Sequence, residues 1–163
     1  MDQYRLNDRS LKFGFSIEPL QKLSPRAPVP TPTPAVSIEP SEYTASSAES
    51  KNPVKNAFDG DSRTRWCASN GNVGQWVCVD YKTPTTVSGV EIQGDQHDKK
   101  YCYVIEGSND GNAWQKLAEG LATSKDSKHR FDANKRFYRV RITKLPGRYW
   151  ASIHELNFTT TSN

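Results

Sequence analysis

Short apolar–polar alternations separated by turn dipeptides are the feature that most constrains this chain. Alternation with a two-residue period is typical of half-buried strands. Turn signals such as Asp59-Gly60, Asn70-Gly71 and Pro146-Gly147 punctuate the sequence, and no helical period accompanies them. This pattern predicts an all-β sandwich or barrel. The expected strands are Gln75–Tyr81, Thr86–Gly94, Lys100–Gly107, Ala113–Ala118, Phe137–Lys144 and Ser152–Thr159.

The alternation also predicts which side chains face the core. Successive side chains of a strand point to opposite faces of the sheet. In the segment 137–144 we expect Tyr138, Val140 and Ile142 in the core, with Arg139, Arg141 and Thr143 facing solvent. In the segment 100–107 we expect Tyr103 and Ile105 to point inward, with Cys102 and Glu106 on the opposite side.

The first 35 residues differ from the rest of the chain. Leu11, Phe13, Phe15 and Ile17 alternate with polar residues or glycine, which indicates one strand that cannot bury its own face. The run SPRAPVPTPTP over residues 24–34 is typical of a stiff spacer between modules. The first residues lack the apolar segment of a signal peptide. We therefore expect a remnant of a preceding domain or tail over 1–23, a Pro/Thr-rich linker over 24–35 and a β-sandwich module over 36–160.

The composition and the absence of certain motifs argue against several classes of function. The formal net charge is +4 and many of the basic residues lie after residue 124, which fits either a solvated face or attraction to an anionic partner. Three cysteines are an odd number, and buried free thiols are the favoured interpretation. The chain lacks a GxSxG nucleophile elbow, a phosphate-cradling glycine loop, a nucleic-acid-binding signature and a long apolar run. We therefore expect no enzyme activity, no nucleic-acid partner and no membrane insertion.

The stretch from Asn56 to Trp66 has the strongest local pattern. Asp59 and Asp61 flank Gly60, and the hydroxyl of Thr64 follows three residues later. A tight turn of this kind brings carboxylate and carbonyl oxygens together, and Ca²⁺ prefers several oxygen ligands in a flexible shell. An ordinary Asx-turn without a metal explains the same spacing equally well.

Several motifs, taken in order, resemble the discoidin (coagulation factor 5/8 type C) family. They cover about residues 41–158, and each is weak alone but specific in combination. They are Ala57-Phe58-Asp59-Gly60-Asp61 with Thr64-Arg65-Trp66, then Gly74-Gln75-Trp76-Val77-Cys78-Val79-Asp80, then residues 103–111 with Trp114, then Phe137-Tyr138-Arg139-Val140-Arg141-Ile142 and finally Ser152-Ile153-His154-Glu155-Leu156.

The resemblance implies a jelly-roll β-sandwich of about eight antiparallel strands, also called galactose-binding-like. Within the family the sequence is most similar to bacterial family 32-type carbohydrate-binding modules, which are lectin-like, non-catalytic parts of secreted glycan-active enzymes. This implies a glycan or polysaccharide partner, a covalently linked catalytic domain and an extracellular or periplasmic location. It also implies one structural calcium ion. By match of motif the ligands are Asn56, Asp59, Asp61, Thr64, His154 and Glu155.

The same resemblance places a shallow sugar site on loops at one end of the sandwich, where an aromatic ring stacks on the sugar. The candidates are Asn70, Asn72, Asp95, His97, Arg148, Tyr149 and Trp150. Cys67 and Asp95 stand where many galactose-binding members have His and Arg, which argues against β-galactosides. The chain also lacks the terminal disulfide of the phospholipid-binding members. Two alternatives stay open: Trp150 capping the sandwich instead of binding sugar, and a structural or protein-docking domain with no sugar site.

Overall fold

The computed structural model describes residues 14, 38–94, 101–122, 126–147 and 149–161. The chain divides into two units, residues 1–33 and residues 34–163. Only Gly14 of the first unit is described. The strand expected around residues 11–17 and the Pro/Thr-rich linker therefore lie outside the described residues.

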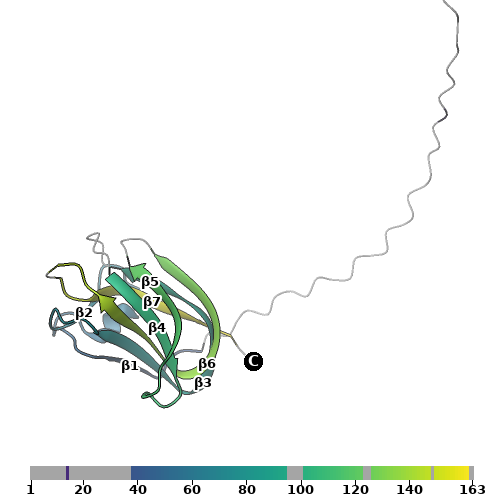
Figure 1. The fold of residues 1–163 in the computed structure, drawn as a ribbon, viewed down its shortest axis with the longest axis horizontal. Coiled ribbons are helices and arrows are strands. Elements are labelled where there is room, and N and C mark those ends of the chain that lie inside the picture. Colours follow the sequence, from purple (N-terminus) through teal and green to yellow (C-terminus); the bar gives the residue numbers. More distant parts are fainter. Residues whose placement is uncertain (1–13, 15–37, 95–100, 123–125, 148, 162–163) are drawn as a thin grey trace, which may run out of the picture. The chain divides into compact units, whose positions relative to one another are not determined.

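The second unit is built almost entirely from antiparallel strands, shown in Figure 1. Hydrogen bonds connect them in the order β2-β7-β3-β6-β4-β5, and β1 pairs with β3. A 3₁₀ turn, η1, precedes β2. The elements are β1 (Glu42–Ala45), η1 (Val54–Ala57), β2 (Trp66–Cys67), β3 (Trp76–Gly94), β4 (Tyr101–Ser108), β5 (Gln115–Ala122), β6 (Ser127–Lys144) and β7 (Ser152–Thr160).

Two long bent strands divide this sheet into two layers. Residues 76–80 of β3 pair with β1 and with residues 137–141 of β6, whereas residues 85–92 pair with residues 127–135 of β6 and residues 87–94 pair with β7. The register of β3 shifts between Asp80 and Thr85, where Lys82 has a left-handed φ of 64°. Each half of β3 and β6 thus belongs to a different layer. The predicted all-β antiparallel sandwich is confirmed.

The core lies between the layers and takes side chains from both. Tyr103, Ile105, Val140 and Ile142 of one layer meet Val90, Ile92, Ile153 and Leu156 of the other, and all are almost completely buried. A smaller cluster closes the far end around Tyr138. Its hydroxyl accepts a hydrogen bond from the Lys135 amide at 2.9 Å and lies 2.7 Å from the Thr85 carbonyl. The inward residues predicted from the alternation are confirmed.

One face assignment was wrong in part. Arg139 and Arg141 lie on the outer face, as the alternation requires, but their side chains are not open to solvent. They are only 16% and 34% exposed because both pair with Glu106 on the neighbouring strand β4. A carboxylate opposite two guanidinium groups holds them against the sheet.

The strand boundaries also differ from expectation. Gln75–Tyr81 and Thr86–Gly94 form one strand, β3, and β6 begins ten residues before the expected Phe137. β1 and β2 were not expected. In the early half of β6, exposed charged residues alternate with the half-buried His129 and Phe131, as in any strand with one face inward. Its inward residues include a histidine, so the apolar pattern in the sequence is weak.

The cysteines are free thiols, and Cys67 and Cys78 are buried, which confirms the expectation for those two. Cys102 is half-buried. Burial raises the pKa of the Cys78 thiol to about 12. Across the described residues, no helix has the length and apolar character needed to cross a membrane.

Candidate functional site

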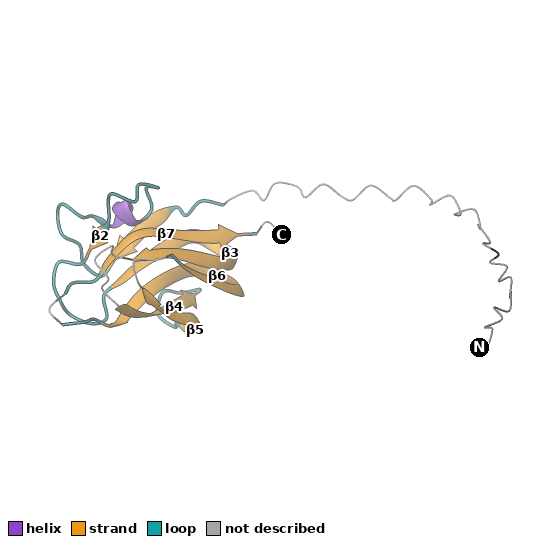
Figure 2. Ribbon diagram, turned by 90° about the horizontal axis from the view of Figure 1, so that it is seen from above, coloured by secondary structure: helices purple, strands orange, loops and turns teal. Residues whose placement is uncertain are grey.

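Two candidate sites occupy the loops around β2, which gather at one end of the strands in Figure 2. The first surrounds the hydroxyl of Thr64. Four acceptor oxygens lie near its Oγ1: both carboxylate oxygens of Asp59 at 2.8 and 3.0 Å, the carbonyl of Asp61 at 3.0 Å and the carbonyl of Asn56 at 3.3 Å. A threonine hydroxyl has one proton, so it satisfies one of these acceptors. The others face each other without a donor from Thr64.

Glu155 on β7 adds a second carboxylate to this oxygen cluster. Its side chain is buried, and neither oxygen accepts a regular hydrogen bond from a described residue. Burial raises the pKa of Glu155, and the nearby Asp59 carboxylate raises it further, while the amides of Gly60 and Asp61 counteract both. Unpartnered buried carboxylate oxygens are costly, and a bound cation removes that cost.

The donor set fits a hard divalent cation. Among the described residues no three His, Cys, Asp or Glu side chains form a cluster, so the oxygens come from two carboxylates, main-chain carbonyls and a hydroxyl. Mixed oxygen shells of this kind suit Ca²⁺. Asn56, Asp59, Asp61, Thr64 and Glu155 would hold the ion, which would join the loop after η1 to β7.

Two of the predicted ligands are placed differently from the others. The carboxylate of Asp61 turns away to Arg63, whose side-chain hydrogen bonds lower the pKa of Asp61 to about 2, and only its carbonyl faces Thr64. The ring of His154 is buried, and its Nδ1 donates to the carbonyl of Ser62 at 2.9 Å. His154 therefore fastens the same loop to β7 through its side chain.

The second candidate site lies where two loops meet. The amide of Ala68 donates to the carbonyl of Ala151 at 2.9 Å, and Cys67 pairs with Ser152, so the loops 67–75 and 145–151 are joined at their bases. Gly71 packs against the edge of Trp150. A Cβ atom on Gly71 would lie 3.2 Å from Cδ1 of that ring, so the absence of a side chain permits the contact.

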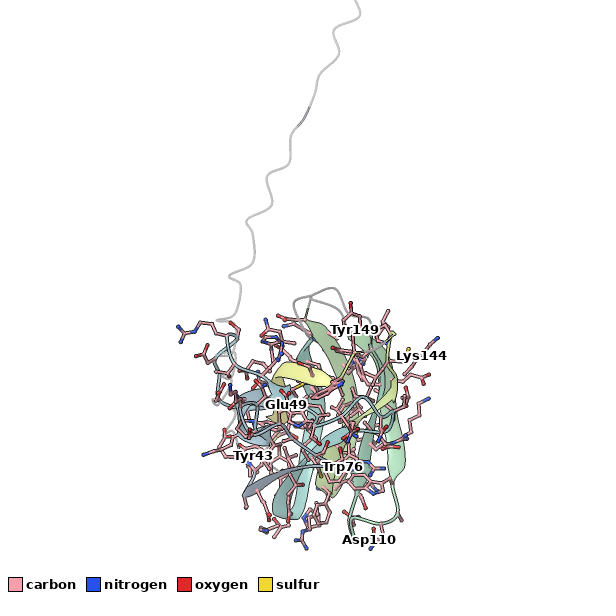
Figure 3. The ribbon with its side chains drawn as sticks, turned by 90° about the vertical axis from the view of Figure 1, so that its left-hand side faces the viewer. Tyr43, Glu49, Trp76, Asp110, Lys144 and Tyr149 are labelled. Carbon is pink, nitrogen blue, oxygen red and sulfur yellow. The ribbon has the colours of Figure 1, made fainter. Side chains whose placement is uncertain are left out.

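Tyr149 and Trp150 stay exposed despite this contact, at 49% and 40%. Trp150 is therefore a partly open ring resting on the neighbouring loop, and it does not cap the sandwich. Tyr149 and Lys144 lie toward one end of the molecule in Figure 3 and Asp110 at the other. Asn70, Asn72, Tyr149 and Trp150 are brought together by the two loops. Asp95, His97 and Arg148 lie outside the described residues.

A family profile matches this arrangement. The profile of the F5/8 type C domain covers residues 42–156, most of the chain and nearly all of the second unit. The chain belongs to this family.

Solved structures similar to this F5/8 type C domain include carbohydrate-binding modules. The family 32 module of AlyQ, in complex with 4,5-unsaturated mannuronic acid, has a TM-score of 0.67 at 24% identity, over 76% of this chain and 97% of that one. A pectin-binding module has a TM-score of 0.66 at 25% identity, over 77% and 94%. No curated protein sequence matches the chain.

Some of these relatives are parts of enzymes. The family 89 glycoside hydrolase of Clostridium perfringens matches with a TM-score of 0.66 at 25% identity, over 77% of this chain but 14% of that one. A domain of similar fold thus forms a small part of that much longer enzyme chain.

Sequence reasoning missed one part of the second site. Gln75, 7% exposed, donates from Nε2 to Oδ1 of Asn70 at 3.0 Å and accepts hydrogen bonds from Ser46 and Ser47. Gln75 stands in the family motif before Trp76, but a glutamine at a strand edge gives no signal that its side chain is buried. The two serines precede it by almost thirty residues in a segment without a strong pattern.

Proposed function

We propose that this domain is a non-catalytic carbohydrate-binding module that holds a larger glycan-active enzyme on its substrate. The observation that carries the proposal is the exposed ring of Trp150, which packs on Gly71 between Asn70 and Asn72, beside the exposed Tyr149. A rigid aromatic ring beside amide groups suits a sugar, because the ring packs on its apolar face while the amides bond its hydroxyls.

The relatives support the same class of ligand. The names of three of them state a complex with 4,5-unsaturated mannuronic acid, binding of pectin, and a chitosan-binding module in complex with chitotriose. Two further structures include an alginate lyase domain or a glycoside hydrolase. A weakly binding module linked to a catalytic domain raises the effective concentration of the enzyme at an insoluble glycan. The proposal includes such a partner domain and export to the periplasm or the extracellular space, which fractionation of the producing cells would test.

We propose in addition that one Ca²⁺ is bound by Asn56, Asp59, Asp61, Thr64 and Glu155, together with the carbonyl of His154. Its support is the shell of acceptors around Thr64 and the unpartnered carboxylate of Glu155. The role is structural. Calorimetric titration should give one calcium per chain for the wild type and none for Asp59→Asn, and equal binding by both proteins would contradict the assignment.

A glycan array tests the main proposal. We expect the wild type, with calcium present, to bind at least one glycan and Trp150→Ala to lose that binding. Trp114→Ala is the control, because Trp114 is a half-buried tryptophan that lies in the β4–β5 turn near Asp110, away from the two loops. No binding by a folded wild type would overturn the proposal and favour a docking domain.

A further inference from the structure

The side chain of Asn70 is held in one orientation by two donors. The backbone amide of Asn72 donates to it at 2.9 Å, and Nε2 of Gln75 lies 3.0 Å from the same atom. A backbone N–H can only donate, so the atom that faces it must be the oxygen Oδ1. The Nδ2 group of Asn70 therefore occupies the other branch of the amide, where no described residue accepts its two hydrogens.

The orientation of Gln75 follows from that of Asn70, because the Gln75 atom that faces the acceptor Oδ1 must be the donor Nε2, and Oε1 then faces two serines. The amide of Trp76 donates to Oγ of Ser46, and the amide of Ser69 donates to Oγ of Ser47. Each hydroxyl has accepted a hydrogen bond and directs its own proton to Oε1 of Gln75, at 2.6 and 2.7 Å. Nε2 of Gln75 is left to donate to Asn70. Both serine branches thus converge on Gln75, which donates in turn to Asn70.

This network gives the loop surface a donor character. Every acceptor along the path from Ser46 and Ser47 to Asn70 is satisfied inside the protein, and the group left over is an N–H₂. The neighbouring indole N–H of Trp150 also donates to no described residue. A ligand at this place must supply acceptor oxygens, and a carboxylate offers about four lone pairs and no donor of its own.

The charges around the two loops favour the same ligand. The described residues of segments 66–76 and 141–151 include Arg141 and Lys144 but no aspartate or glutamate. Arg141 is occupied by Glu106, whereas Lys144 is exposed and lies toward the same end as Tyr149 (Figure 3). The exposed ammonium group of Lys144 attracts anionic ligands to this end of the domain.

We infer that Asn70, held with its N–H₂ outward by the Ser46–Ser47–Gln75 network, binds the carboxylate of an acidic sugar whose ring packs on Trp150. The inference rests on the proposed function and specifies its ligand class as uronate-containing glycans. Asn70 contacts the ligand, and Gln75 is a positioning residue.

Asn70→Asp tests this inference with little change in shape. The new carboxylate still accepts from the amide of Asn72 and from Gln75, so the loop is preserved, but an oxygen replaces the outward N–H₂. Trigalacturonate and trimannuronate serve as probes, beside the same trisaccharides with their carboxylates reduced to alcohols. We expect at least one acidic probe to bind the wild type at least about tenfold more tightly than its reduced form, and Asn70→Asp to lose at least about tenfold in affinity for it.

Asn134→Asp is the matched control. It makes the same atomic change on β6, where Asn134 contacts Thr86 away from both loops, and it should bind like the wild type. Gln75→Glu tests positioning: it removes the donor to Asn70, so it should lower the preference for the acidic over the reduced probe. A merely structural role would weaken both probes equally. Thermal melts establish that each variant is folded.

The outcomes separate the two proposals. Equal binding of acidic and reduced probes, or unchanged binding by Asn70→Asp, would overturn this inference and leave the proposed function standing. Binding of neutral glycans on the array without binding of either uronate would do the same. Failure of the wild type to bind any glycan, acidic or neutral, would overturn the proposed function itself.

Discussion

At the scale of single residues, Glu106 is a buried charged residue on the outer face of the sheet. Its carboxylate accepts from Nε of Arg139 at 2.7 Å and from Nε and Nη2 of Arg141 at 3.0 and 2.8 Å. Trp114 covers Arg139, whose guanidinium carbon lies 3.8 Å from the ring centre. Burial alone would raise the pKa of Glu106, but the two arginines outweigh it and hold that pKa below its ordinary value of 4.5.

Glu106→Gln should therefore destabilise the domain at neutral pH by about 2 kcal/mol, since it leaves two half-buried guanidinium groups without a counter-charge. Because the pKa of Glu106 is lowered by folding, its contribution is complete above pH 4.5 and is lost as the pH falls through the folded value. Urea unfolding at pH 7 and pH 3 should thus show a gap between variant and wild type that shrinks in acid.

Glu119→Gln is the control for that measurement. Glu119 pairs with Lys116 at 2.7 Å, but its side chain is 66% exposed, so its loss should cost less than about 0.5 kcal/mol. A gap for Glu106→Gln that is equally small, or that does not change with pH, would contradict a buried charge cluster on this face.

The thiols give a second prediction at this scale. Only the thiolate reacts, and burial raises the pKa of Cys78 to about 12, while Cys67 is also buried. Native protein at pH 8 should therefore be alkylated at Cys102 alone, and Cys102→Ser should remove the labelling. Denatured protein should show three reactive thiols. Rapid native labelling of Cys78 would mean that the β1–β3 edge opens.

The residues of the candidate sites were predictable to different degrees. Asp59, Thr64 and Glu155 follow from sequence motifs, because the chemistry of a cation needs oxygens and the family spacing supplies them. The network of Gln75 with Ser46 and Ser47 was not predictable, since polar residues thirty positions apart carry no periodic signal. Likewise, pairing with Glu106 depends on the register of β4 against β6, which alternation alone does not give.

At the scale of elements, the pairing of β3 with β6 requires the two backbones to lie very close together at Gly89. Gly89 lies at a register shift between pairs with β6 and β7, so its neighbours are backbone on both sides. A Cβ atom there would collide with the carbonyl oxygen of His129. The glycine permits one strand to be hydrogen-bonded to two others at the bulge.

Gly89→Ala should therefore cost at least about 2 kcal/mol, because the colliding atom is backbone and cannot turn aside. Ser88→Ala is the control on the same strand, as it removes only a hydroxyl that donates to the carbonyl of Thr159 at 3.3 Å. Chemical denaturation of both variants gives the comparison. A cost for Gly89→Ala no larger than that for Ser88→Ala would show that the strands can move apart at this point.

Two strands, the early half of β6 and β2, were not predicted from the sequence. The early half of β6 places His129, Phe131 and Ala133 inward between Lys128, Arg130 and Asp132, so charge conceals the two-residue period. β2 has only two residues and is set by its partner β7 and by the buried ring of Trp66. Short strands of this kind arise from tertiary packing and leave too little sequence to show a period.

At the scale of the whole molecule, the proposed calcium would connect segments distant in sequence. The loop at residues 56–64 and the strand β7 are almost one hundred residues apart, and they meet at Asp59 and Glu155. An ion bound only by the folded state stabilises it by mass action, by about 2.7 kcal/mol at a hundredfold excess over the dissociation constant. For a domain of this size that corresponds to a rise in Tm of roughly 10 °C.

We therefore expect chelation by EDTA to lower the Tm by roughly 10 °C, and added Ca²⁺ to restore it. Asp59→Asn should melt at the chelated temperature and respond to neither reagent. Asp132→Asn, which changes an exposed carboxylate on β6, should respond like the wild type. Differential scanning calorimetry in matched buffers measures all three proteins. If wild type and Asp59→Asn melt at the same temperature with and without calcium, the oxygen cluster is an Asx-turn that binds no ion, and the loop is held to β7 by His154 and its own hydrogen bonds.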